Sequence, residues 1–176
     1  MRSSRYTFLV GAPGSQWSGI GQLITDNFNY NKSDETPDRV YPHGEFSGHK
    51  GSYFGPGMTE GNDFHRLKES YVDRLRFELM CDSPFSESDS DKTKMIKCHQ
   101  FAYGLDWLKE NVPSSNILLV KRPTEVSFDW WKEAGGWDIT YPNYEWYLDD
   151  AHMRHYIDVE IKLADMFVKG TDNHWS

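Results

Sequence analysis

The sequence has few cysteines, a deficit of basic residues and no long apolar run, and each shortage excludes a class of protein. Two cysteines, Cys81 and Cys98, make neither a disulfide framework nor a zinc site, so reduced thiols and a cytoplasmic location are expected. The 19 Lys and Arg against 27 Asp and Glu give a net charge of -8, which argues against a broad nucleic-acid-binding surface. No apolar run reaches the length of a membrane span, and the one near the N-terminus is too short for a signal peptide.

The 176 residues fit one domain with a sizeable core, so we expect a single domain over 1–176. Aromatic residues make up 15% of the chain, and such rings pack cores or line pockets. Glycines and aromatics interrupt the pattern at about 29–62, where we expect a long loop insertion. Within it, 41–61 is a candidate acceptor-side lid whose rings stack on a flat group, or a cap on the core.

Short apolar runs alternate with helical stripes along the chain. Apolar runs predict strands at 6–12, 93–100 and 116–123, the last buried on both faces. Apolar spacing predicts helices over 17–28, 63–80, 102–111 and 124–134, a surface loop at 83–91, and a last helix from near Asn143 to Lys169-Gly170. This alternation predicts an α/β fold of three layers, with a parallel central sheet and helices on both faces. Ligands of such sheets bind beyond the carboxyl ends of the strands.

The first predicted strand ends in a glycine loop, Gly11-Ala12-Pro13-Gly14-Ser15, and a helix follows at once. A Walker A loop requires a glycine and then a lysine, but Gln16 stands at the glycine position counted from Gly11, and Ile20 stands at the lysine position counted from Gly14. Hydrolysis of ATP or GTP is therefore disfavoured. Backbone amides and a helix N-terminus can hold an anion without a lysine, and a plain strand–helix turn is the other interpretation.

Two further predicted strands end in residues with useful chemistry. His99 could act as a general base near neutral pH, and Lys97, two residues earlier on a strand, would point to the same side and neutralise developing negative charge. Arg122 suits a bidentate phosphate contact. The alternatives are a surface lysine beside a hydrogen-bonded loop histidine, and a solvated strand end.

Taken in chain order, these segments resemble the sulfotransferases that use 3'-phosphoadenosine 5'-phosphosulfate (PAPS). The family's first loop, PKSGTTW, lies over 11–17 and matches at Gly14, Ser15 and Trp17. The family's strand ending in KTH resembles Lys97-Cys98-His99. Its later strand, VxRxPxxVxxS, resembles VKRPTEVSFDWW, and its C-terminal signature, RKGxxGDW, resembles VKGTDNHW at 168–175.

The resemblance implies a P-loop NTPase-like, sulfotransferase-type fold that transfers a sulfuryl group from PAPS to a hydroxyl of a small-molecule or glycan acceptor. His99 would be the catalytic base, and Lys97 would steady the departing charge. The first loop would hold the 5'-phosphosulfate, and Arg122 would be among the residues that hold the 3'-phosphate. The implied cofactor-binding residues are Gly11, Gly14, Ser15, Gln16, Trp17, Ser18, Arg122, Ser127, Lys169 and Gly170. Neither a metal nor a nucleic-acid or membrane partner is expected.

The chain also departs from the family pattern. The family's loop lysine falls on Ala12, its 3'-phosphate serine falls on either Ser127 or Asp129, and its C-terminal arginine falls on Val168. A P-loop kinase-like phosphotransferase is the rival enzyme, although it too would need the missing Gly-Lys pair. A nucleotide- or glycan-binding domain that has lost catalysis is the other rival. The missing loop lysine supports that rival, and the retained lysine and histidine oppose it.

Overall fold

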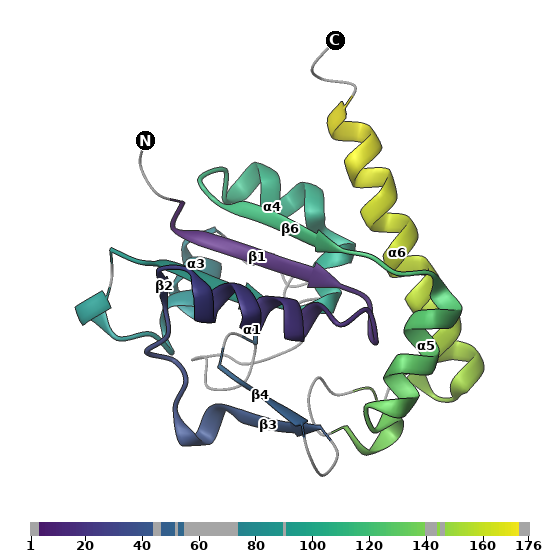
Figure 1. Cartoon of the computed structure of the whole chain (residues 1–176). Coiled ribbons are helices and arrows are strands. Elements are labelled where there is room, and N and C mark those ends of the chain that lie inside the picture. The colour runs from purple at the N-terminus through teal and green to yellow at the C-terminus, as the bar shows by residue number, and fades with distance from the viewer. Residues whose placement is uncertain are drawn as a thin grey trace.

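The computed structural model describes residues 4–43, 47–51, 53–54, 74–89, 91–139, 144 and 147–172. Within them lies a parallel sheet of four strands in the order β2-β5-β1-β6 (Figure 1). The strands are β1 (Tyr6–Gly11), β2 (Tyr30–Asn31), β5 (Thr93–Lys97) and β6 (Asn116–Val120). Two registers fix the centre of the sheet, because Leu9 lies opposite Lys97 on one side and Leu118 on the other. The predicted parallel sheet is therefore confirmed.

Five α-helices surround this sheet in the described part of the chain. They are α1 (Trp17–Asn27), α3 (Arg74–Asp82), α4 (Leu105–Asn111), α5 (Thr124–Glu133) and α6 (Asp150–Asp172). A second sheet pairs β3 (Val40–His43) with β4 (Ser47–Lys50) in antiparallel fashion. Short 3-10 helices are found at Pro37–Arg39, Glu87–Asp89, His99–Gly104 and Gly136–Asp138.

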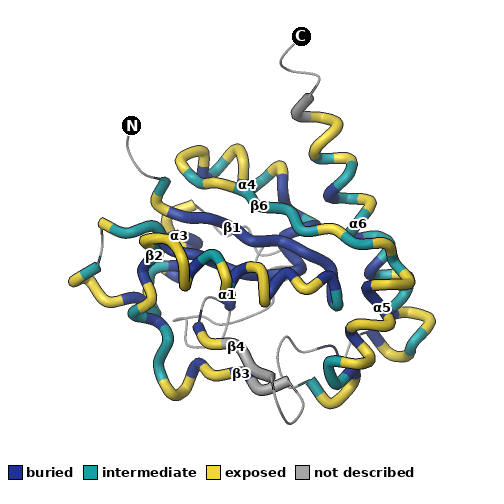
Figure 2. Tube along the Cα trace, in the orientation of Figure 1, coloured by how far each residue is buried: buried dark blue, intermediate teal, exposed yellow. Residues whose placement is uncertain are grey.

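The central strand β1 is buried along its whole length, and its side chains serve two separate cores (Figure 2). Phe8 and its neighbours at alternate positions pack with residues of α3, α4 and the His99–Gly104 turn. Leu9 points to the opposite face, where it packs with Trp17 of α1 and Met95. Each such ring or aliphatic side chain contributes about 1.5–3 kcal/mol when fully buried. Helices on both faces thus enclose the sheet, as the three-layer prediction requires.

A third core lies at the carboxyl end of the sheet, where α5 and α6 pack together. Phe128 and Trp131 of α5 meet Met153 and Ile157 of α6 in this cluster. Figure 1 shows the carboxyl ends of β1 and β6 directed toward these two helices. The predicted site region, beyond the ends of the strands, is therefore enclosed by α5 and α6.

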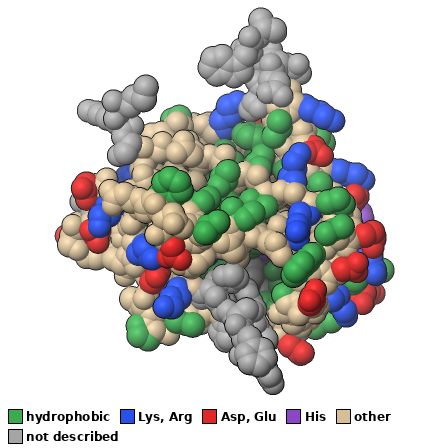
Figure 3. All heavy atoms as spheres, in the orientation of Figure 1, with side chains coloured by type: hydrophobic (Ala, Val, Ile, Leu, Met, Phe, Trp, Pro, Cys, Tyr) green, Lys and Arg blue, Asp and Glu red, His purple; other side chains and the backbone are tan. Residues whose placement is uncertain are grey.

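The last predicted strand corresponds to β6, but β6 is not buried on both faces. It forms one edge of the sheet, its side chains from Ile117 to Val120 are only half-buried, and Asn116 is exposed. Ile20 and Leu23 of α1 are also exposed. Figure 3 shows hydrophobic side chains gathered over the face that carries β6 and α1. Strand order is not encoded in the local pattern, so a run of aliphatics could not distinguish an edge from a centre.

Several predicted boundaries are wrong. The insertion at 29–62 contains β2, β3 and β4, and the strand predicted over 93–100 ends at Lys97, where a 3-10 turn begins two residues later. The last α-helix begins at Asp150 rather than near Asn143 and continues to Asp172. The predicted helix over 63–80 is seen only as α3, because 63–73 lies outside the described residues. Most of the predicted lid at 41–61 lies outside them as well.

Candidate functional site

The loop between β1 and α1 is a tight turn with two left-handed residues. Gly14 has φ +75°, Gln16 has φ 64°, and the Ser15 N–H donates to the carbonyl of Ala12 over 3.0 Å. Gln16 stands at the N-cap of α1 but makes no side-chain cap. The first N–H groups of an α-helix have no partner inside the helix, so this uncapped end can donate to an anion.

Close packing of this loop against α5 requires glycine at position 14. A Cβ on Gly14 would lie 1.8 Å from the carbonyl oxygen of Ser127 and 2.7 Å from the amide nitrogen of Trp131. At Gly11, a Cβ would lie 2.5 Å from the Cβ of Trp17. Gly14 therefore lets α5 pack against the loop before α1, and Gly11 lets Trp17 of α1 pack against the end of β1.

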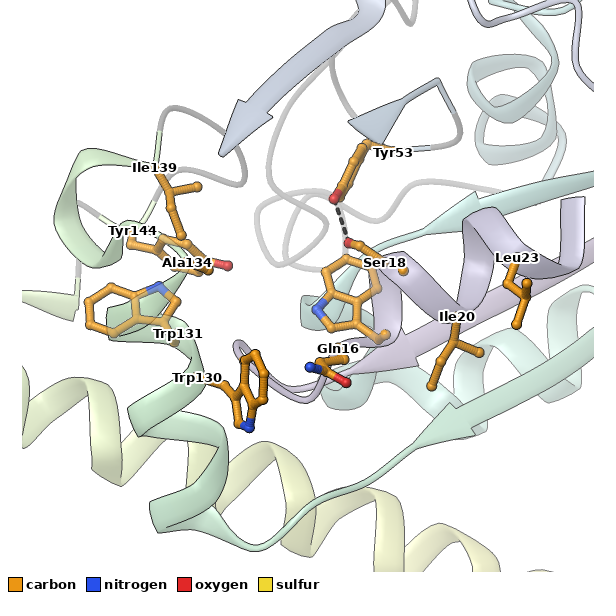
Figure 4. Close-up of a pocket in the computed structure, with 13 residues that line it drawn as sticks. Gln16, Ser18, Ile20, Leu23, Tyr53, Trp130, Trp131, Ala134, Ile139 and Tyr144 are labelled. Carbon is orange, nitrogen blue, oxygen red and sulfur yellow. Dashed lines mark hydrogen bonds between the residues drawn. The ribbon is translucent and has the colours of Figure 1, made fainter. Parts of the chain in front are cut away.

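Between the start of α1 and α5 lies a cavity of about 400 Å³, which we call the α1–α5 cavity. Gly14 and the first turns of α1 form one wall, and α5 forms the other. Five rings line it: Trp17, Tyr53, Trp130, Trp131 and Tyr144. Figure 4 shows Trp131 and Tyr144 facing Ser18 and Tyr53 across the hollow, with the Tyr144 hydroxyl directed into it. Its volume falls in the range of small-molecule sites.

Four polar atoms in the loop before α1 and in or just before α5 are buried without a hydrogen-bond partner among the described residues, and of their residues only Trp131 lines the cavity itself. They are Ser15 Oγ, Ser127 Oγ, Trp131 Nε1 and Arg122 Nη1. The Arg122 guanidinium lies over the Trp130 ring, 5.4 Å from its centroid. A buried polar group left unpaired costs about 1–3 kcal/mol, so unpaired groups on the two elements that flank the cavity make this region a candidate ligand site.

Lys97 is buried below α1 and does not line the cavity. It is 1% exposed, and a Cβ on Gly21 of α1 would lie 3.0 Å from its Cδ. Burial lowers the pKa of Lys97 to about 8, against the opposing effects of Asp34 and Glu35. Its ammonium lies 4.5 Å from the centroid of the Tyr53 ring. Lys97 therefore reaches the cavity only through that tyrosine.

Tyr53 connects this lysine with the first helix. Its hydroxyl lies 2.5 Å from Ser18 Oγ, as the dashed line in Figure 4 marks. Burial raises the pKa of Tyr53, and the hydrogen bond with Ser18 opposes that rise. The hydroxyl is therefore neutral and can donate a hydrogen bond.

His99 begins the 3-10 turn after β5 and is 1% exposed. Its Nδ1 lies 2.8 Å from Glu160 Oε1 and 3.3 Å from the Tyr147 hydroxyl. The His99 ring also lies 5.6 Å from the ring of Tyr144, which lines the cavity. The alternative of a surface lysine is wrong, since Lys97 is buried, whereas the hydrogen-bonded histidine of that alternative agrees with the contacts of His99. His99 lies next to the cavity, with Tyr144 as the shared wall.

The structure does not bring Lys169 and Gly170 to the first loop. The helix α6 continues through both residues, and Gly170 lines a separate cavity beside α4, with Lys109 and Phe167. At a rise of about 1.5 Å per residue, Lys169 lies about 14 Å further along α6 than Glu160. Trp175 of the C-terminal motif lies outside the described residues.

The sequence interpretation missed Glu160, Tyr144 and Tyr147. A signal for Glu160 was present, because it falls on the apolar stripe formed by Ile157, Ile161 and Ala164 of α6. A carboxylate on a buried stripe needs a partner, so its position indicates a buried pair.

Comparison of the chain with protein-family models, curated proteins and solved structures finds no match. Within the described ranges, no group of three or more His, Cys, Asp and Glu residues is placed to hold a metal ion. No helix in the same ranges has the length and apolar character needed to cross a membrane.

Proposed function

We propose that this protein is a PAPS-dependent sulfotransferase with a P-loop NTPase-like fold. The observation that carries the proposal is that residues from the ends of three different strands lie at or beside one cavity: Gly14 lines it, and Arg122 and His99 each contact a ring of its wall. Gly14 touches α5, Arg122 stacks on a ring of the cavity, and His99 packs against another. This is the position at which open α/β sheets bind nucleotides.

The unpaired groups divide into two sets that suit the two ends of PAPS. The free amides at the start of α1 and Ser15 Oγ would hold the 5'-phosphosulfate. Arg122 and Ser127, which carry buried atoms without partners among the described residues, would hold the 3'-phosphate. Of the two candidates for the family's serine, Ser127 is buried behind Gly14, whereas Asp129 is exposed. Trp130, 41% exposed at the cavity, would pack on the adenine.

The transfer would be an in-line displacement at sulfur, in which positioning and charge stabilisation supply most of the catalysis. The acceptor oxygen forms a bond to sulfur while the bond from sulfur to the bridging phosphate oxygen breaks. His99 takes the hydroxyl proton, and 3'-phosphoadenosine 5'-phosphate (PAP) leaves with the electron pair. Because Ala12 replaces the family's lysine, the amides of α1 would stabilise the leaving phosphate. Lys97 would add positive charge from behind Tyr53.

A binding domain without catalysis is a second candidate, favoured by one observation. Neither His99 nor Lys97 lines the α1–α5 cavity, so a ligand that fills it would not touch either side chain directly. Such a domain would bind PAP and transfer nothing.

The first test is thermal unfolding with PAP and, separately, with ATP and Mg²⁺. Saturation with PAP at 100 times its Kd adds about 2.7 kcal/mol of stability, because the ligand binds only the folded chain. For a chain of this size that corresponds to a rise in Tm of about 5–11 °C. ATP with Mg²⁺ should give no comparable rise. Protection by ATP alone, or by neither ligand, would contradict the proposal.

Transfer itself requires a separate measurement. We expect labelled sulfate to move from PAPS to at least one acceptor class in a panel of glycans, phenols and lipids. Binding of PAP without transfer to any of them would support the non-catalytic binding domain instead.

A further inference from the structure

The carboxylate of Glu160 is buried against the imidazole of His99. Both residues are 1% exposed, and the described structure places no other basic side chain within ion-pair distance of Glu160. Its Oε1 lies 2.8 Å from His99 Nδ1, whereas Oε2 has no hydrogen-bond partner among the described residues. Acidic side chains are seldom buried this completely unless they are paired, so this contact accounts for the position of Glu160.

Tyr147 indicates which atom carries the proton. Burial, and secondarily the charge of Glu160, raise the pKa of Tyr147 well above its usual value, so its hydroxyl stays protonated. That hydroxyl has one hydrogen, and it donates to Glu160 Oε1 over 3.2 Å. The same oxygen lies 2.8 Å from His99 Nδ1, and because an ionised carboxylate oxygen can only accept, this contact places a hydrogen on Nδ1. With the hydrogen on Nδ1, the lone pair of the ring is on Nε2.

Two other tyrosines near this pair, Tyr144 and Tyr103, stay uncharged near neutral pH. Burial raises the pKa of Tyr144, which packs on the His99 ring, and of Tyr103, whose pKa the charge of Glu160 raises further. Tyr156 packs edge-on against Tyr147 at 5.0 Å, and the Cys98 thiol precedes His99 in the chain. None of these groups supplies a cation that could replace His99 as the partner of the carboxylate.

Nε2 of His99 makes no hydrogen bond to the described residues, so it is the nitrogen left for a substrate. A base needs its lone pair directed at the acceptor hydroxyl, and a carboxylate on the other nitrogen selects that tautomer. The same carboxylate stabilises the imidazolium that forms when the proton arrives. Selecting the tautomer and stabilising the imidazolium both require only the contact between Glu160 Oε1 and His99 Nδ1.

We propose that Glu160 of α6 is a positioning residue that holds His99 in the Nδ1–H tautomer, with Nε2 as the proton acceptor. Its importance for catalysis depends on the proposed sulfuryl transfer, whereas the tautomer itself is a property of the folded chain. Glu160 acts through His99 and does not contact the reacting atoms.

The decisive experiment measures the tautomer in the full chain without any substrate. Long-range ¹H–¹⁵N correlation spectra of protein labelled at histidine distinguish a protonated nitrogen from one with a free lone pair, and a His99→Asn sample assigns the signals. We expect neutral His99 to carry its hydrogen on Nδ1. A hydrogen on Nε2 would overturn the proposal, whether or not the protein transfers sulfate.

The second experiment replaces the carboxylate with an amide of the same shape. In Glu160→Gln the amide N–H₂ can donate to Nδ1, so the hydrogen should move to Nε2 and kcat should fall by about 10²–10⁴-fold. Loss of the neighbouring negative charge should also move the acidic limb of the pH–rate profile to lower pH. Glu160→Asp, which keeps the charge, should restore part of kcat. A Glu160→Gln protein with the parental tautomer and pH profile would contradict the proposal.

A matched control is available on the same helix. Asp165→Asn removes a carboxylate that is 41% exposed and pairs with Lys121 at the surface, so tautomer and kcat should stay unchanged. If PAP does not bind and PAPS supports no transfer, the proposed function fails while the spectra still decide the tautomer. If Glu160→Gln does not fold, the spectrum of the parental protein decides it alone.

Discussion

Replacing Gly14 with Ala tests whether the first loop is fixed against α5. The new methyl group would lie 1.8 Å from the Ser127 carbonyl oxygen, in a backbone conformation with φ +75° that side chains disfavour. The left-handed conformation costs about 1–2 kcal/mol. Moving α5 away from the methyl group costs about 1–3 kcal/mol more, as in other overpacked sites. The free energy of unfolding should therefore fall by about 2–5 kcal/mol.

The assay is urea unfolding followed by circular dichroism, with Gly19→Ala as the matched control. Gly19 lies in α1 beside the same cavity, but a Cβ there would meet nothing within 4 Å. Alanine should stabilise that helix position by up to about 1 kcal/mol. If Gly14→Ala unfolds within about 0.5 kcal/mol of the parental protein, as an unconstrained surface change would, then the described contact between loop and α5 is refuted.

Two further substitutions test the buried cations. Burial lowers the pKa of Lys97 from its ordinary value of 10.5 to about 8, so between these pH values the unfolded chain binds a proton that the folded chain does not. Lys97→Met should raise the free energy of unfolding by about 3 kcal/mol at pH 7, and this gain should shrink from pH 8 and vanish above about pH 10.5. A gain that does not vary with pH in urea titrations would contradict this prediction. Arg122→Ala should weaken PAP binding by about 10–100-fold in isothermal titration calorimetry, because a hydrogen bond to a charged group contributes about 1.5–3 kcal/mol. Arg154→Ala, which removes a guanidinium stacked on Phe128 and paired with Glu125, should leave PAP affinity unchanged, and equal losses in the two variants would refute a specific phosphate contact.

The sequence predicted those parts of the fold that depend on short-range pattern. The strand at Tyr6–Gly11 and the helix at Trp17–Asn27 were located to within one residue, because a run of apolar residues stops at Gly11 and a helical spacing follows. The antiparallel pair β3 and β4 was missed because glycine and proline interrupt any alternation of apolar residues there. The 3-10 turn from His99 to Gly104 was missed because six residues are too few to show a helical period, so the prediction divided them between a strand at 93–100 and a helix at 102–111.

The candidate site was predicted only where its residues can be recognised from short-range sequence pattern. The glycine-rich loop around Gly14 can be recognised from neighbouring residues alone. The ends of two predicted parallel strands place Arg122 and His99 at the same edge of the sheet. The contact between His99 and Glu160 joins residues 61 positions apart, so no local pattern contains it. Lys97 was predicted to point to the same side as His99. Its side chain instead lies against α1 and Tyr53, whereas His99 contacts Glu160 of α6.

The order of the strands has a consequence for how the chain acquires its structure. The innermost strand, β1, comes first in the chain, yet both of its neighbours, β5 and β6, come from the second half. At about 5–20 residues per second, the ribosome releases Tyr6–Gly11 many seconds before either partner exists. Pairing strands so distant in sequence also requires closing long loops, which slows folding of the complete chain. During synthesis β1 is therefore an apolar strand without partners until β5 is made, and such a strand is prone to aggregation.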